Sequence, residues 1–191
     1  MRITQFTQHI ELLATKSRLT FHITSAYYRM LVKREARLAD IREGDRVLCI
    51  GGGICPYTAI LLHKYTGAHI TVIDNNRSCV EKARKFVNRL GLDKIKILPG
   101  DGRDICCHGY TVIHLAMQIT PKESVINEIL NKAEKGTRVL VRKPKKSVGS
   151  LYCTMPEYEK NFAACVKHSL LSNVDQTYVC IVEKGAVGFL S

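Results

Sequence analysis

The sequence lacks any apolar run close to the ~20 residues that a membrane-spanning helix needs. Its first residues, among them Gln5, Gln8 and Glu11, do not form the apolar core of a secretory signal. Internal repeats are also missing. We therefore expect a cytoplasmic protein without membrane contact, and 191 residues with 46% hydrophobic content favour a single compact domain.

Metal-binding and disulfide patterns are also lacking. The chain has eight cysteines but no C-x-x-C pair, and Cys106 and Cys107 are adjacent. The histidines near the predicted strand ends include no i, i+4 pair that would hold a metal ion, and isolated histidines there are commonly just hydrogen-bonded. We expect reduced, mostly structural cysteines and no metal site.

Acidic residues are few, at 17 against 29 lysines and arginines, which gives a net charge of +12. Such a balance favours an anionic partner, and nucleic acid is the obvious candidate. The basic residues are spread along the chain, however, and their one dense cluster is 142–146. Residues 117–120 also lack the N-P-P-aromatic and proline-cysteine motifs of enzymes that modify bases. Nucleic acid is therefore possible but not favoured.

The hydrophobic pattern predicts an α/β fold. Helical periodicity runs from about residue 8 to 38, and strands then alternate with helices from 46 to 141, which implies a mostly parallel sheet. We expect residues 1–40 to form a helical segment that packs on a Rossmann-like domain of residues 41–191. The predicted helices are 57–65, 77–90, 121–134 and about 157–170, and a final strand at 177–182 would give the sheet an antiparallel edge.

A glycine turn at residues 51–53 joins the first predicted strand to the helix that follows it. Gly51 and Gly53 allow the backbone to adopt a positive φ and to approach a ligand closely. Pro56 suits the first helical turn, where its missing N–H would have no partner. The N–H groups of Thr58 and its neighbours, at the positive end of the helix dipole, would then face a carboxylate or phosphate.

Two aspartates follow neighbouring strands, Asp74 after strand 68–73 and Asp101 after strand 94–98. Ligands of open α/β sheets bind at this carboxyl edge, and an acid about 20 residues after the glycine turn is placed to accept from ribose hydroxyls. A dinucleotide fold needs only that first acid, and its G-x-G-x-x-G loop has glycine or alanine where this chain has Pro56. A second acid that accepts from an adenine amino group indicates S-adenosylmethionine (SAM) instead.

The loop that begins at Gly51 resembles the G-x-G-x-x-P-x-T loop of the nicotianamine synthase family, a branch of SAM-dependent enzymes. The run 28–36 is similar to that family's tyrosine-bearing helix, 112–116 to its fourth strand, and 139–142 to its fifth strand, which ends in arginine. The likeness covers roughly residues 24–146, and the proline-threonine loop is its most specific element. It implies a Rossmann-like class I SAM-dependent methyltransferase fold.

The resemblance also implies the residues of the site. Tyr28 matches the family's tyrosine, and Glu11 is a candidate for the glutamate that the family supplies from an N-terminal helical domain. Arg142 is the candidate clamp for an anionic substrate. The residues expected to bind SAM are Gly51, Gly52, Gly53, Pro56, Thr58, Asp74, Asn75, Asp101, Gly102 and Leu115.

The chemistry depends on which carbon of the SAM sulfonium meets the nucleophile. Attack on the methyl group is methyl transfer, whereas attack on the γ-carbon transfers a 3-amino-3-carboxypropyl group and releases methylthioadenosine. The resemblance implies the second reaction, with a small amine or amino acid as the acceptor. Two alternatives remain: a small-molecule methyltransferase, and a non-catalytic SAM- or nucleic-acid-binding protein. A homo-oligomer is possible.

Overall fold

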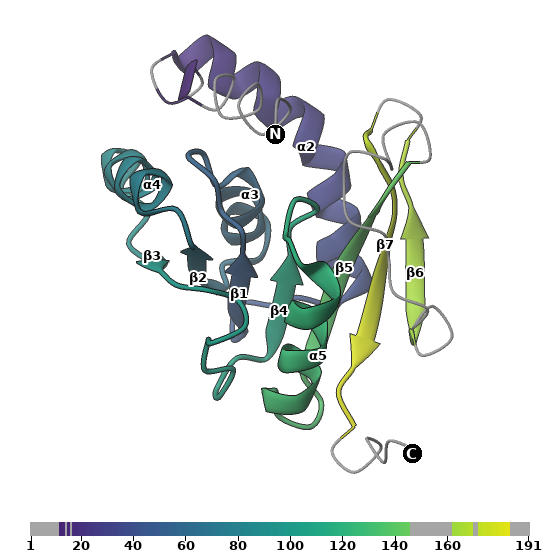
Figure 1. Ribbon diagram of the computed structural model, residues 1–191. Helices are drawn as coiled ribbons and strands as arrows, with labels where there is room; N and C mark the ends of the chain where they lie inside the picture. Colours follow the sequence, from purple (N-terminus) through teal and green to yellow (C-terminus); the bar gives the residue numbers. More distant parts are fainter. Residues whose placement is uncertain (1–11, 14, 16, 146–161, 170–171, 184–191) are drawn as a thin grey trace.

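The computed structural model describes residues 12–13, 15, 17–145, 162–169 and 172–183 (Figure 1). Its centre is a seven-stranded sheet in the order β3-β2-β1-β4-β5-β7-β6. Strands β1 to β5 are parallel, and β7 runs antiparallel to both β5 and β6. The predicted fold class is confirmed. The strands are β1 Arg46–Ile50, β2 His69–Asp74, β3 Ile95–Pro99, β4 Val112–Leu115, β5 Arg138–Pro144, β6 Ala164–Lys167 and β7 Val174–Ile181.

Three helices lie between the parallel strands: α3 Tyr57–Thr66, α4 Arg77–Arg89 and α5 Lys122–Lys132. Their bounds agree with the sequence prediction because the signals at their ends are strong. The side chain of Asn76 caps α4 by accepting from the backbone N–H of Cys79, and Gly91, with φ 66°, follows the last turn. Pro56 stands at the N-cap position of α3.

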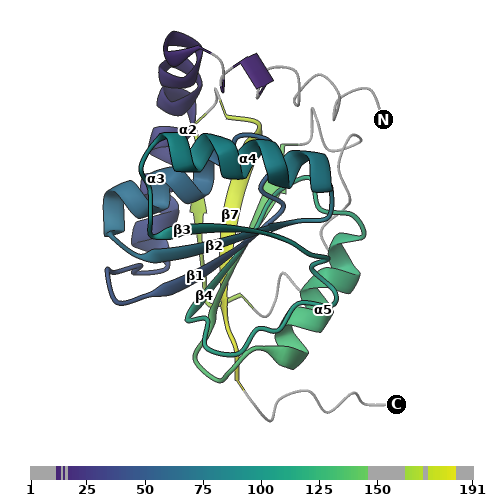
Figure 2. The same ribbon diagram turned by 90° about the vertical axis from the view of Figure 1, so that its left-hand side faces the viewer.

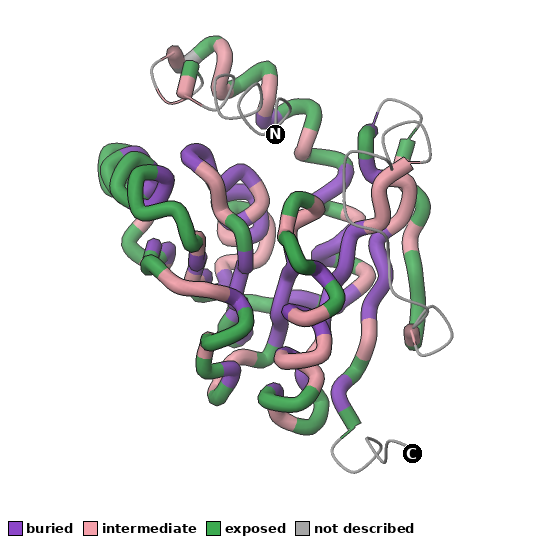
Figure 3. Tube along the Cα trace, viewed as in Figure 1, coloured by how far each residue is buried: buried purple, intermediate pink, exposed green. Residues whose placement is uncertain are grey.

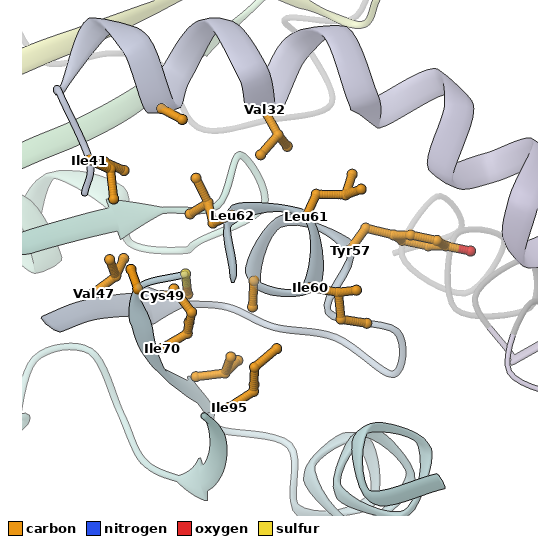
Figure 4. Close-up of a cluster of buried hydrophobic side chains, with 14 of the residues drawn as sticks. Val32, Ile41, Val47, Cys49, Tyr57, Ile60, Leu61, Leu62, Ile70 and Ile95 are labelled. Atoms are coloured by element: carbon orange, nitrogen blue, oxygen red, sulfur yellow. The ribbon is translucent and has the colours of Figure 1, made fainter. Parts of the chain in front are cut away.

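The helices cover the two faces of the sheet unequally (Figure 2). Helices α2 (Arg18–Leu38), α3 and α4 pack on one face of the sheet. They form a single core with every second residue of the strands, among them Val47 and Ile70 (Figure 4). Helix α5 packs on the other face against Leu48, Ile113 and Val141. Because side chains alternate along a strand, each core takes every second residue.

Helix α2 makes up most of the described part of the predicted N-terminal helical segment. Ser17 caps it by accepting from the N–H of Thr20. Its buried face, which includes Leu31, Val32 and Ala36, packs on α3, and the helix also contacts the edge strand β6. Its first half extends beyond the carboxyl ends of the strands in both views (Figures 1 and 2).

The predicted helix 157–170 is wrong over residues 164–167, and its remainder lies largely outside the described residues. Ala164–Lys167 forms the edge strand β6, with Cys165 opposite Tyr178 and Lys167 opposite Gln176 of β7. Without β6 the backbone groups on this side of β7 would have no ladder partner, so tertiary pairing overrides local helical periodicity here. Within the part of the chain that the structure describes, no helix is both long and apolar enough to cross a membrane.

Candidate functional site

A cleft of about 820 Å³ opens at the carboxyl edge of the sheet, where α/β proteins bind ligands. The glycine turn, Asp74 and Asp101 line it on one side, and Tyr28 and Arg142 line it on the other. The fold therefore brings together residues from α2, β1, β2, β3 and β5. The predicted site residues that line the cleft are Tyr28, Gly51, Gly52, Gly53, Pro56, Thr58, Asp74, Asn75, Asp101, Gly102 and Arg142.

The glycines of the cleft meet two separate requirements. Gly51 and Gly53 have φ values of 83° and 64°, as predicted, and side chains rarely tolerate this conformation. Gly52 and Gly102 are needed for packing instead. A Cβ on Gly52 would lie 2.3 Å from Cγ1 of Val72, and one on Gly102 would lie 2.8 Å from Cγ2 of Ile50. The backbone at Gly52 and Gly102 therefore lies directly against side chains of β2 and β1, with no room for a side chain of its own.

The carboxylate of Asp74 organises the glycine turn as well as lining the cleft. Its Oδ2 accepts from the N–H of Gly53 at 2.8 Å, and its Oδ1 accepts from the N–H of Asn76 at 2.9 Å. Each carboxylate oxygen can accept more than one hydrogen bond, so both oxygens keep capacity for hydroxyl donors. Asp74 thus joins the loop of β1 to the end of β2.

The carboxylate of Asp101 pairs with Arg103, whose Nη2 lies 2.7 Å from Oδ2. The hydrogen bonds from the side chain and backbone of Arg103 lower the pKa of Asp101 to about 2. Asp101 is therefore ionised at neutral pH and serves only as an acceptor. The pair is solvent-exposed and correspondingly weak, so it does not prevent Asp101 from accepting a further donor.

Beneath the cleft lies a buried polar network that the sequence interpretation missed. Its centre is Glu35 of α2, which is completely buried. Glu35 accepts from Nε and Nη2 of Arg142, both at 2.7 Å, and from Oγ1 of Thr177 at 2.7 Å. Nε2 of His114 lies 3.3 Å from its Oε2. The strand register explains this convergence, because Arg142 and Thr177 are directly paired across β5 and β7.

The network reaches the cofactor loop through Arg142. Nη2 of Arg142 also donates to Oγ1 of Thr58 at 3.1 Å, on the first turn of α3. The backbone carbonyl of Arg142 accepts from Nζ of Lys122, a fully buried lysine of α5. Arg142 is only 5% exposed, and its guanidinium is held by Glu35 of α2 and Thr58 of α3 while it borders the cleft.

The protonation states in the network follow from its charges. Burial alone would raise the pKa of Glu35, but the charge of Arg142 and the hydrogen bonds from Arg142 and His114 outweigh it and hold that pKa well below its usual range. Burial and the charge of Arg142 lower the pKa of His114, so its imidazole is neutral at pH 7. Burial also raises the pKa of Cys49, another cleft residue, to about 12, which keeps this thiol protonated and unreactive.

Tyr28 lies in an aromatic stack between α2 and α3. Its ring stacks on Tyr57 at 5.3 Å between centroids, and Tyr57 stacks in turn on Phe21 at 5.6 Å. Tyr28 is half-buried and also interacts electrostatically with Arg142. The stack fixes the ring and leaves it at the border of the cleft.

Two predicted site residues do not appear in the cleft. Leu115 requires a correction: it is fully buried in the core beneath α5, and the next residue, Ala116, lines the cleft instead. The alternation of side chains along β4 explains this, since Leu115 points to the α5 face. Glu11 lies outside the described residues. Among the described residues, no group of three or more His, Cys, Asp or Glu side chains is placed to hold a metal ion.

Comparison with known families decides the class of this site. The family model described as protein-L-isoaspartate(D-aspartate) O-methyltransferase (PCMT) matches residues 9–183. The chain belongs to the PCMT family. That family is one of class I SAM-dependent transferases, so SAM is the cofactor of the family to which this chain belongs.

Curated relatives resemble only parts of this PCMT-family chain. L-histidine 2-aminobutanoyltransferase of Yersinia pestis is 23% identical over 131 residues, which are 69% of this chain and 49% of that protein. Protein-L-isoaspartate O-methyltransferase 2 of Archaeoglobus fulgidus is 36% identical over 67 residues, or 34% of this chain and 30% of that protein. The chain thus matches about half or less of the length of these relatives.

Solved structures share the fold over most of the chain. A mutant of MtNAS, a nicotianamine synthase, in complex with S-adenosylmethionine has a TM-score of 0.81 and 25% identity, and the match covers 94% of this chain and 73% of that one. An RNA methyltransferase from Salinibacter ruber in complex with S-adenosyl-L-homocysteine has a TM-score of 0.68 and 20% identity, with 85% and 97% covered. The second likeness concerns the fold alone.

The residues of this PCMT-family cleft fit the cofactor. The two strand-end carboxylates of Asp74 and Asp101 are available as acceptors for hydroxyl and amino groups, and the positive-φ glycine turn brings the backbone close beside them. The cleft volume lies in the range of small-molecule sites, roughly 300–1,000 Å³. The individual contacts remain predictions.

Proposed function

We propose that the protein transfers the 3-amino-3-carboxypropyl group of SAM to the amine of a small molecule, most simply an amino acid. The observation that carries the proposal is the pairing of a SAM-type cleft with a likeness to MtNAS along 94% of the chain. A structure of MtNAS in complex with MTA and tNA matches with a TM-score of 0.80 at 25% identity. The relative that acts on L-histidine supports an amino acid as the acceptor.

Bound SAM would supply an electrophilic carbon beside its sulfonium, and Asp74, Asp101 and the glycine turn would hold its nucleoside. The other side of the cleft would receive the acceptor. Arg142 is the one cationic side chain among the described lining residues. No described residue accepts from its Nη1, which can therefore donate to a carboxylate of the substrate. Tyr28 would position the acceptor amine or take its proton.

Replacing Tyr28 with phenylalanine tests this assignment because it keeps the aromatic stack and removes only the hydroxyl. We expect SAM affinity to stay near that of the wild type and turnover to fall at least ~10-fold, about 1.4 kcal/mol of barrier. Calorimetry gives the affinity, and chromatography of the nucleoside by-product gives the rate. Tyr65→Phe is the matched control, since Tyr65 packs on the same core but does not line the cleft. Full activity of Tyr28→Phe would leave Tyr28 a packing residue.

Methyl transfer is the second candidate, and membership of the PCMT family is the observation in its favour. SAM with a labelled methyl group distinguishes the two reactions. Aminocarboxypropyl transfer leaves the methyl label on the nucleoside, whereas methyl transfer moves it to the acceptor. Label on the acceptor would therefore overturn the proposal while leaving the cofactor site intact.

A further inference from the structure

Helix α2 has large apolar side chains on its solvent side as well as on its buried side. Leu19 is 70% exposed, Ile23 64% and Met30 58%. A surface helix ordinarily turns a polar face to water, and isolated exposed apolar residues need no explanation. Here three of them lie along one line of the helix, with the exposed Ala26 between Ile23 and Met30. We refer to Leu19, Ile23, Ala26 and Met30 as the α2 stripe.

The spacing of the α2 stripe is that of a helix-pairing seam. Successive members are four, three and four residues apart, which is the a/d pattern of a heptad repeat. Ala26 in the middle would let a second helix approach closely. In the described residues nothing covers this line: the outer side of α2 is exposed (Figure 3), and the helix projects past the strand ends. The opposite face is already occupied by the core.

The charges beside the stripe indicate what kind of helix would pair with it. Its flanking positions carry His22 and Arg29 on one side and Arg34 on the other, and Lys33 and Arg37 continue its line. The one acid of α2, Glu35, is buried in the network beneath the cleft. The solvent side of α2 is thus apolar and basic without an acidic residue. A second copy of a chain with net charge +12 would meet its own charges there.

We propose that the α2 stripe is a docking surface for an amphipathic helix of an acidic partner protein. The partner would place apolar residues against Leu19, Ile23 and Met30 and glutamates or aspartates opposite Arg29 and Arg34. The bound helix would lie beside the cleft, because Tyr27, next to the stripe, is one of the residues that line it. The hydroxyl of Tyr27 accepts a hydrogen bond from the backbone N–H of Asn173 at 2.8 Å, which fixes the Tyr27 side chain at the edge of the cleft.

A designed peptide tests the proposal on the full chain. The probe is a fluorescein-labelled three-heptad helix with leucine at a and d and glutamate at e and g, and the control peptide has lysine at e and g. We expect fluorescence anisotropy to show saturable binding of the acidic peptide, weaker at high salt, and at least ~10-fold weaker binding of the basic one. Ile23→Glu/Met30→Glu should reduce binding of the acidic peptide at least ~10-fold.

Controls separate docking from misfolding and from other occupants. Neither substituted residue lines the cleft, so the double variant should keep wild-type SAM affinity and circular dichroism. Absence of acidic-peptide binding, or binding that ignores the double substitution, would overturn the proposal. So would self-association lost in the double variant on sedimentation, which would assign the stripe to a second copy. Stripe-dependent binding to phosphatidylserine-containing vesicles without peptide binding would assign it to a lipid surface.

Discussion

Replacing Glu35 with glutamine is expected to lower the free energy of unfolding by about 3–5 kcal/mol, because it leaves the guanidinium of Arg142 buried without a counter-charge. Glu35 accepts four hydrogen bonds, from Arg142 twice, from Thr177 and from His114, and the side chains of these three residues are all buried. For a chain of this size the loss corresponds to a melting temperature lower by roughly 6–20 °C. Chemical denaturation followed by circular dichroism measures it.

A surface carboxylate provides the matched control. Glu43 pairs with Lys94 at 3.2 Å, but its side chain is 76% exposed, so Glu43→Gln should cost less than about 1 kcal/mol. Replacing both Glu35 and Arg142 with methionine should cost less than replacing Glu35 alone, since the double variant leaves no buried charge unpaired. A Glu35→Gln variant as stable as Glu43→Gln would contradict this, and would mean that solvent in the cleft replaces the carboxylate as the partner of Arg142.

Replacing Asp74 with alanine is expected to weaken SAM binding by about 5- to 150-fold, which corresponds to roughly 1–3 kcal/mol. We expect the upper part of this range because the substitution has two effects. It removes the acceptor predicted for the ribose hydroxyls, and it releases the N–H of Gly53 that Oδ2 holds at 2.8 Å. Isothermal titration calorimetry with SAM measures the change directly.

Asp101→Ala should also weaken binding within this range, without disturbing the glycine turn. Asp104→Ala is the control: Asp104 is an exposed carboxylate three residues further on, and it does not line the cleft. It should bind SAM as the wild type does. If Asp74→Ala and Asp101→Ala both kept wild-type affinity, the assignment of these carboxylates to the cofactor would be wrong.

The sequence predicted those parts of the fold that local signals determine. The alternation of strands and helices from 46 to 141, the helix predicted at 77–90 and the positive φ at Gly51 and Gly53 each depend on a few neighbouring residues, and the structure confirms them. Strand β6 could not be found in this way. Its residues become a strand only because β7 offers backbone partners, and that pairing is tertiary.

The polar network was missed for a related reason. Glu35 and Arg142 are 107 residues apart in the sequence, and Glu35 and Thr177 are 142 apart. One signal was available. Glu35 falls on the same helical face as the buried residues Leu31 and Val32, and Arg142 directly follows the buried run of β5. Two charged residues at buried positions each need a partner of opposite charge, and the simplest inference is that they pair with one another.

The identity of the nucleoside by-product tests the central claim most directly. The full chain would be incubated with SAM and an amino acid acceptor such as L-histidine, and the products would be separated by mass spectrometry. Transfer of the aminocarboxypropyl group predicts methylthioadenosine and an acceptor heavier by that group. S-adenosylhomocysteine with a methylated acceptor would contradict the account and identify the protein as a methyltransferase.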